Sequence, residues 1–331
     1  NPYEVTNYGY PDDVLFSFFG RANYDFDSKY LFSATFRADG SSKFSKDNRW
    51  GYFPSAAVAW RISSESFMEK THNWLDDLKL RFSYGTAGNN NIPSDQTSPV
   101  WSSSSTTWLN QFPSYWTSGI ASGQSGSYAS NPDLKWETTI TRNMGLDYTL
   151  FGGKLTGSFE YYWNTTKDLL IAFPVSGSGY DYQYRNLGET ENKGIDLTIN
   201  STNITNKNFT WNTSITLSHN KNSVKKLTGE DVQLWEANFG YSQNTHIIGV
   251  NQPLGQMYGY VTDGLYQVSD FDYDAATKTY TLKDGVPYAG EKGNVKPGMW
   301  KFKNIDGSKD NKITEADKTV IGNAYPKIYG G

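Results

Sequence analysis

Hydrophobic and polar residues alternate one by one along several segments of this chain. In the segment 155–164, Phe159 and Tyr161 fall on one side of an extended chain and Glu160 falls on the other. A period of two residues is that of a β-strand with one apolar and one wet face. Such runs occur near 14–24, 30–37, 56–62, 78–85, 138–150, 155–164, 194–200 and 209–218. The pattern predicts an all-β protein with roughly eight strands, and Tyr325–Gly331 reads as the start of another strand.

The alternation also predicts which side chains share a face. Aromatic residues dominate one face, while the other carries Arg, Lys, Glu and Asp. The side chains expected to point to lipid are Phe32, Phe36, Leu80, Phe82, Phe159, Tyr161, Trp211 and Ile215. Those expected to point to a lumen are Ser33, Arg37, Arg81, Glu160 and Asn212. Aromatic residues at strand ends, where a membrane interface favours them, are Trp50, Trp60, Trp136 and Trp163.

The connections between these strands alternate between short and long. Short turns are expected near 25–29, 151–154 and 201–208, and long loops near 38–55, 85–137, 165–193 and 219–325. Outer-membrane barrels have short periplasmic turns and long external loops, whereas a β-sandwich has no physical reason to sort its loops. We therefore predict a transmembrane antiparallel β-barrel, with a secreted all-β glycan-binding or glycan-cleaving protein as the alternative. The chain lacks an apolar stretch of about 18 residues, but a barrel strand needs only about 9–11.

Composition narrows the classes of function further. The chain has 331 residues, of which 37% are hydrophobic and 16% aromatic, and its mean hydropathy of −0.65 is polar. The net charge of −4 argues against nucleic acid as a partner. The absence of cysteine removes disulfides and thiolate chemistry. The three histidines are scattered, and no nucleophile elbow or phosphate loop is present, so we expect a protein that is not an enzyme.

The segment 306–317 has the spacing of a calcium loop. Oxygen-bearing side chains occupy loop positions 1, 3, 5, 9 and 12, and position 7 offers a backbone carbonyl. Asn311 replaces the usual glycine, although Asn tolerates a left-handed conformation. The predicted ligands of a structural Ca²⁺ are Asp306, Ser308, Asp310, Lys312, Thr314 and Asp317. The alternative is an acidic surface turn.

Aromatic residues in the predicted long loops are candidates for stacking on a sugar or peptide substrate. The residues proposed for this role are Trp101, Trp108, Trp116 and Tyr182, from a wider set of loop aromatics that also includes Tyr115, Tyr180, Tyr184 and Trp235. Packing within the loops is the alternative reading for each of them.

Several phrases along the chain resemble one family in sequence order. They are Tyr30–Phe44, Arg49–Ser55, Leu78–Gly85, Gly88–Asn89, Asn131–Thr139, Asn192–Asp196, Pro253–Tyr260, Thr262–Gln267 and Lys296–Gly298. Together they resemble the C-terminal barrel half of SusC/RagA-like TonB-linked outer-membrane transporters. Any one phrase alone would be weak, whereas the ordered set is specific.

This resemblance implies a multi-pass protein of the bacterial outer membrane, with a barrel of about 22 strands around a plug domain. Residues 1–331 would then be a partial barrel domain with extracellular loops at about 85–137, 165–193 and 219–325, and the plug and final strands would lie outside the chain. The function implied is TonB-dependent import of a glycan or peptide with a SusD-like lipoprotein, with TonB acting on the plug. A siderophore- or cobalamin-type receptor is the rival within the same fold.

Overall fold

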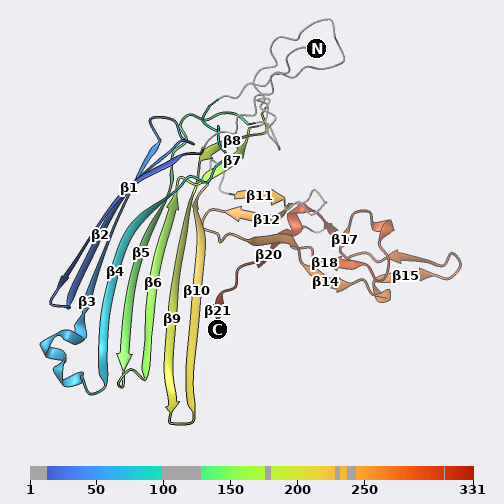
Figure 1. Ribbon diagram of the computed structural model, residues 1–331. Coiled ribbons are helices and arrows are strands. Elements are labelled where there is room, and N and C mark those ends of the chain that lie inside the picture. The colour runs from blue at the N-terminus through green and yellow to red at the C-terminus, as the bar shows by residue number, and fades with distance from the viewer. Residues whose placement is uncertain (1–12, 99–127, 176–179, 228–231, 237–243, 309) are drawn as a thin grey trace, which may run out of the picture. The chain divides into compact units, whose positions relative to one another are not determined.

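The computed structural model describes residues 13–98, 128–175, 180–227, 232–236, 244–308 and 310–331 (Figure 1). Two compact units are present. The first comprises Asn1–Thr228 with Lys327–Gly331, and the second comprises Gly229–Pro326. Within the described residues, no helix is long and apolar enough to cross a membrane.

The first unit is built on one antiparallel sheet, which we call the wall (Figure 1). Its nine described strands, in spatial order, are β1 (Leu15–Phe26), β2 (Tyr30–Ser41), β3 (Trp50–Arg61), β4 (Leu75–Asn89), β5 (Glu137–Leu150), β6 (Leu155–Lys167), β9 (Glu189–Thr205), β10 (Thr210–Lys226) and β21 (Ile328–Gly330). The eight long strands coincide with the eight alternating segments of the sequence. The strand expected within Tyr325–Gly331 is also confirmed, because β21 pairs with β10.

Most of the long strands extend further than the alternation indicated. Asn220, Lys221 and Asn222 show no apolar face, yet they continue β10 and pair with residues of β9. Backbone hydrogen bonds form the ladder whatever the side chains are. The excursion predicted to begin at 219 therefore begins only after Lys226, where β10 ends.

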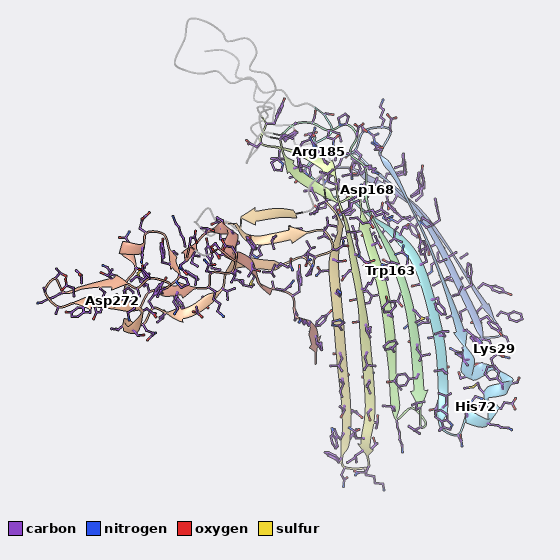
Figure 2. The ribbon with its side chains drawn as sticks, turned by 180° about the vertical axis from the view of Figure 1, so that it is seen from behind. Lys29, His72, Trp163, Asp168, Arg185 and Asp272 are labelled. Atoms are coloured by element: carbon purple, nitrogen blue, oxygen red, sulfur yellow. The ribbon has the colours of Figure 1, made fainter. Side chains whose placement is uncertain are left out.

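The connections predicted to be short and those predicted to be long emerge at opposite ends of the wall. Antiparallel pairing puts the connections 27–29, 62–74, 151–154 and 206–209 at one end, which we call the turn end. The connections 42–49, 90–136, 168–188 and 227–327 lie at the other, the loop end. Figure 2 shows Lys29 and His72 at the turn end, and Asp168 and Arg185 at the loop end. The predicted sides are therefore confirmed, but the lengths are not strictly sorted: the long loop expected at 38–55 is only 42–49, shorter than the 62–74 connection at the turn end.

Two connections at the turn end differ in how they are built. Between β5 and β6, Phe151, Gly152 and Gly153 all have positive φ, of 59°, 64° and 78°. Both glycine amides donate to Oδ2 of Asp76, at 2.8 and 3.2 Å. The connection between β3 and β4 instead contains two 3₁₀ helices, η1 (Ile62–Ser64) and η2 (Ser66–Thr71).

The two faces of the wall differ in chemistry as the alternation predicted. Phe82, Met144 and Tyr161 pair directly across β4, β5 and β6 on one face, which we call the apolar face. Seven of the eight side chains expected there are 38–53% exposed, rather than packed against a second sheet: Phe32, Phe36, Phe82, Phe159, Tyr161, Trp211 and Ile215. On the opposite, polar face, Arg81 and Glu160 bond to one another. A soluble sandwich would bury the apolar face in its core.

A small core lies at the loop end of the wall. It consists of Phe44, Phe53, Ile92, Leu134 and Trp136. The assignment of Trp136 to an interface belt was wrong: its ring is 8% exposed, and its Nε1 donates to the carbonyl of Arg49 at 3.0 Å. Phe44, in a loop, and Phe53, on β3, pack against the ring from positions distant in sequence, so its place at a strand end did not reveal its environment.

A hairpin and a separate unit fill the longer connections. The hairpin is β7 (Leu170–Pro174) with β8 (Tyr182–Asn186). The second unit has a four-stranded sheet of β11 (Val232–Glu236), β12 (Asn244–Gly249), β13 (Gln256–Tyr260) and β20 (Lys318–Asn323). Its smaller strand pairs are β14 (Thr262–Leu265) with β18 (Trp300–Phe302), β15 (Phe271–Asp274) with β16 (Thr279–Leu282), and β17 (Tyr288–Ala289) with β19 (Lys312–Ile313). Its short helices are η3 (Val268–Asp270), η4 (Lys292–Asn294) and η5 (Glu315–Asp317). Tyr266, Phe271, Leu282 and Val295 form its core.

Two neighbouring substitutions on β6 test the assignment of faces. Phe159→Arg puts a charge on the apolar face, and Ser158→Arg puts the same charge on the polar face, where Ser158 pairs with Asp147. In a bilayer we expect Phe159→Arg to lower the free energy of unfolding by about 2–4 kcal/mol, and Ser158→Arg to be tolerated. Urea unfolding of the full-length protein in lipid vesicles measures both. Equal losses would contradict a lipid-facing apolar face.

Candidate functional site

The polar face of the wall carries a network of charges drawn from three neighbouring strands. Arg81 on β4 donates through Nη2 to Oδ1 of Asp147 at 2.8 Å and to Oε1 of Glu160 at 2.7 Å. Lys79 approaches the other oxygen of Asp147 at 2.9 Å. Asn143 donates to the second oxygen of Glu160 at 3.1 Å. Each carboxylate is thus paired with a cation, and the network fixes these side chains on the polar face of the wall.

Glycines make room for the long side chains of this face. A Cβ at Gly145 would lie 2.9 Å from Nη2 of Arg81 and 3.0 Å from its Cζ, so the guanidinium rests over that glycine. A Cβ at Gly194 would lie 2.2 Å from the hydroxyl of Tyr162. Strand glycines commonly mark such close approaches. Both side chains therefore lie along the wall instead of projecting from it.

Of the four residues proposed for substrate binding, Tyr182 alone lies within the described part of the chain, and Tyr184, from the wider set of candidates, lies beside it. The ring of Tyr182 stacks on Tyr128 at 6.3 Å between centroids, and it meets Tyr184 edge-on at 5.8 Å. Burial raises the pKa of Tyr128 and of Tyr184, so both remain neutral phenols at physiological pH. This tyrosine cluster lies on and beside β8 at the loop end. The other three candidates, Trp101, Trp108 and Trp116, lie outside the described residues.

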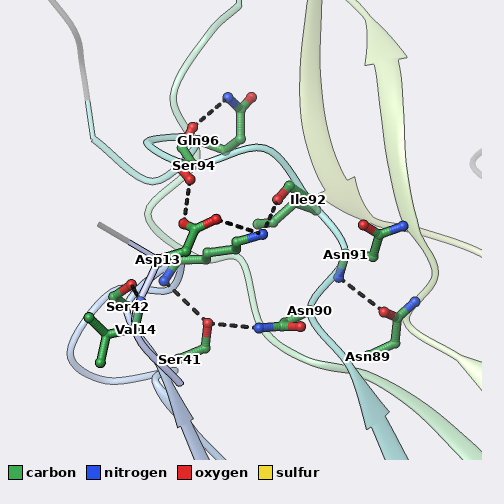
Figure 3. A network of polar contacts seen from close by, with 11 residues as sticks. Asp13, Val14, Ser41, Ser42, Asn89, Asn90, Asn91, Ile92, Ser94 and Gln96 are labelled. Carbon is green, nitrogen blue, oxygen red and sulfur yellow. Dashed lines mark hydrogen bonds and ion pairs between the residues drawn. The ribbon is translucent and has the colours of Figure 1, made fainter. Parts of the chain in front are cut away.

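Polar contacts tie the loops together at the same end (Figure 3). Nζ of Lys43 donates to the carbonyl of Ile92 at 2.8 Å and pairs with Asp13 at 3.4 Å. Asp13 also accepts from the hydroxyl of Ser94. Nδ2 of Asn90 donates to Oγ of Ser41 at 2.9 Å. The described base of the 90–136 connection is thereby fixed to strand ends on β1 and β2.

The predicted calcium loop shows part of the geometry expected of it. Asn311 has a φ of 58°, the left-handed conformation anticipated for loop position 6. The amide of Ser308 donates to Oδ1 of Asp306 at 2.7 Å, and its hydroxyl donates to Oδ1 of Asp310 at 2.9 Å. The amide of Lys312 donates to Oδ1 of Asp310 and lowers the pKa of that carboxyl. Loop positions 1, 3 and 5 are therefore brought together.

Asp317, at loop position 12, has a different environment. Its side chain is fully buried, and it accepts from the amides of Thr314, Ile305 and Asp306 at 2.8, 2.7 and 3.1 Å. These hydrogen bonds hold the pKa of its carboxyl below the ordinary value, and the bond from the amide of Thr314 contributes most. Asp317 thus joins the two ends of the loop. Among the described residues, no three carboxylate or imidazole side chains gather closely enough to hold one metal ion.

Sequence reasoning placed Arg81 and Glu160 on the polar face, but it could not pair them. Their partner Asp147 lies 66 residues from Arg81, and Glu160 lies 79 residues from it. The register of β4, β5 and β6 brings the three together. Asp147 alternates with apolar residues in the sequence, and that signal would have placed it on the polar face.

Comparisons with known proteins find similar sequences for most of the chain. Residues 1–298 match the family described as TonB dependent receptor-like, beta-barrel. The chain is 38% identical over 320 residues to TonB-dependent receptor P3 of Formosa agariphila, which covers 96% of this chain and 30% of that protein. It is 42% identical over 223 residues to TonB-dependent receptor SusC of Bacteroides thetaiotaomicron, which covers 66% of this chain and 22% of that protein.

A solved structure shows the same fold. The RagAB peptide importer in its closed-closed state superposes with a TM-score of 0.70 and 26% identity, covering 96% of this chain and 31% of that one. The chain thus spans about a third or less of the length of the proteins it matches.

Substitution of Gly145 tests the charge network on the polar face. We expect Gly145→Val to displace the guanidinium of Arg81 and to separate it from Asp147 and Glu160. These groups are about one-third exposed, so screening should limit the loss of stability to about 1 kcal/mol. Gly20→Val is the matched control, because a Cβ at Gly20 meets nothing within 4 Å. Urea unfolding of the full-length barrel measures both, and equal effects would contradict the role given to Gly145.

Proposed function

This chain belongs to the family of TonB-dependent receptor-like β-barrels, and on that premise we propose that it forms part of the wall and outer loops of a nutrient importer. The observation that carries the proposal is the two-faced wall, apolar on one side and charged on the other, with its long connections at one end. An outer-membrane barrel needs that distribution, because its outside meets lipid and its inside meets water. The eight long strands have 12–17 residues each. Each exceeds the roughly 9–11 residues that cross a bilayer, which supports a multi-pass arrangement.

The proposed substrate is an oligosaccharide or a peptide too large for simple diffusion. Similarity to SusC favours this class over a siderophore- or cobalamin-type receptor. The RagAB neighbours are peptide importers, which keeps peptides in the proposal beside glycans. The partners proposed are a SusD-like surface lipoprotein at the loop end and TonB, acting on a plug outside this chain. Import, not catalysis, is the proposed activity.

The tyrosine cluster is the described surface to which the proposal assigns substrate contact. Tyr182 is 5.8 Å from Tyr184 and 6.3 Å from Tyr128, so the three rings present adjoining aromatic surface at the loop end. Aromatic rings stack on sugar faces and on peptide side chains with little loss of conformational entropy.

Binding and uptake by the full-length protein test this function. Tyr182→Ala should weaken binding of the transported oligosaccharide or peptide about tenfold, a change of about 1.4 kcal/mol. Tyr273→Ala is the control, since Tyr273 is an exposed aromatic on a different hairpin. Titration of the purified protein with glycan and peptide panels measures affinity, and uptake by cells lacking TonB shows the energy requirement. Uptake that persists without TonB, or a protein without heat-modifiable migration on a gel, would overturn the proposal.

We also propose that the segment 306–317 binds Ca²⁺ in a structural role. Asp306, Ser308, Asp310 and Thr314, with the carbonyl of Lys312, are the oxygens on which the proposal relies. Asp317 holds the loop closed through its three amide partners. Clustered carboxylates repel one another without a cation, and external calcium would fill even a weak site of about 10⁻⁴–10⁻³ M.

Limited proteolysis of the full-length protein separates these two roles. Asp310→Ala should expose the loop to cleavage as a chelator does, and added calcium should no longer protect it. Asp317→Asn should loosen the loop with or without calcium, because the neutral amide accepts hydrogen bonds less strongly than the carboxylate. If neither chelation nor Asp310→Ala changes the cleavage pattern, the segment is an ordinary acidic turn.

A further inference from the structure

A row of basic residues interrupts the apolar face of the wall. Tyr84, Arg142, Trp163, Lys193 and Lys221 pair directly across β4, β5, β6, β9 and β10. The next row toward the turn end, on the same strands, holds Phe82, Met144, Tyr161, Ile195 and His219. We call Arg142, Lys193 and Lys221 the basic row. Alternation assigned this face to lipid, so three cations there require an explanation.

Two cations of this row, Arg142 and Lys193, lie over one indole. The guanidinium of Arg142 lies 4.8 Å from the ring centre of Trp163 and 5.9 Å from that of Tyr84. Nζ of Lys193 lies 4.6 Å from the same indole ring. Nη1 of Arg142 also donates to Oγ1 of Thr165 at 3.2 Å. Stacking of this kind orients a guanidinium while leaving other N–H groups able to donate.

Positive charge in this region exceeds negative charge. Glu191 pairs with Lys193 at 3.0 Å and Lys225 at 3.1 Å, and Glu189, two positions further along β9, lies opposite Lys167 and Lys226. Glu191 also accepts from Nε1 of Trp163 at 2.7 Å. In the described parts of the chain, neither Arg142 nor Lys221 forms an ion pair. Arg142 and Lys221 are therefore the cations of the row that lack a carboxylate partner among the described residues, and they can attract an anion.

The row lies at the edge of the apolar band toward the loop end. Arg142 is eight positions from Leu150, where β5 reaches the turn end, or about 26 Å along the strand at about 3.3 Å per residue. Strands tilted by about 35–45° rise only about 19–22 Å over that length, so the row lies just inside the edge of an apolar band about 25 Å tall. Figure 2 shows Trp163 part-way along β6, toward the end that carries Asp168. From just inside that edge, the long basic side chains of the row can reach the level of the lipid headgroups.

A groove in the apolar face begins at the basic row. It encloses about 510 Å³, and Arg142 and Trp163 line it together with Val58, Phe82, Met144 and Tyr161. The basic row at one end of an apolar groove matches the shape of a lipid, in which a charged headgroup is joined to a hydrocarbon chain.

We propose that this site binds a phosphate-bearing lipid of the outer leaflet, with its phosphate at the basic row and an acyl chain in the groove. Arginine recognises phosphate through paired N–H donors, and lysines beside a membrane add attraction for anionic headgroups. The inference rests on the proposed function in one respect, that the loop end faces outward. The alternative is that these basic side chains extend toward any lipid headgroup without recognising phosphate, and the experiment has to distinguish the two.

The experiment compares lipid retention by the full-length protein with and without the basic row. Purified protein is incubated with lipid A, with enzymatically dephosphorylated lipid A, or with phosphatidylcholine, and bound lipids are counted by native mass spectrometry. We expect the wild type to retain lipid A at least tenfold better than either other lipid. The variant R142Q/K193Q/K221Q should lose this preference. The control K29Q/K154Q/K207Q removes three positive charges at the turn end and should keep it.

Heat-modifiable migration of every variant shows whether the barrel has folded, which separates failure of the lipid site from failure of the barrel itself. If the triple variant does not fold, Arg142→Gln alone carries the test, with an expected loss of at least threefold. Equal retention of phosphorylated and dephosphorylated lipid A, or unchanged preference in the basic-row variant, would overturn the proposal.

Discussion

The wall depends on one constraint: backbone N–H and C=O groups must pair with each other wherever water does not reach. An unpaired group in hydrocarbon costs several kcal/mol, so an irregular register is tolerable only near the strand ends. The register shifts of the long described strands occur at Leu75/Asp77, Trp211/Asn212 and Val224/Lys226. Each lies in the first or last few residues of its strand. Between them the ladders of β4, β5, β6, β9 and β10 run without interruption.

A fixed register then dictates how side chains share the space above the sheet. On the polar face, the guanidinium of Arg81 and the ring of Tyr162 reach across to neighbouring strands, and each lies over a glycine. The missing side chains at Gly145 and Gly194 thus shape this surface as much as the charged groups do. On the apolar face, aromatic rings occupy the corresponding rows. One face of the sheet is therefore charged, and its long side chains lie flat against the strands. The other face is apolar, and its aromatic rings are exposed.

Alternation of polarity was enough to predict the strands and their faces, because a two-residue period is a local property of the chain. It could not predict which strands pair, and so it missed the bonds that join Arg81 to Asp147 and Glu160. It also misplaced Trp136, which is buried against Phe44 and Phe53, residues far away in sequence. The left-handed Asn311 was anticipated from its residue type. The amide partners of Asp317 were not, because they arise from the path of the folded loop.

The neighbours β10 and β21 are separated in sequence by the whole of Gly229–Pro326. Loop closure becomes harder only slowly with length, by about 0.6 kcal/mol for each doubling, and this insertion has its own core around Tyr266 and Phe271. The wall can therefore exchange one insertion for another of different size while its register stays unchanged. Recombination can therefore replace the inserted unit while the barrel is retained, and the two parts can evolve at different rates.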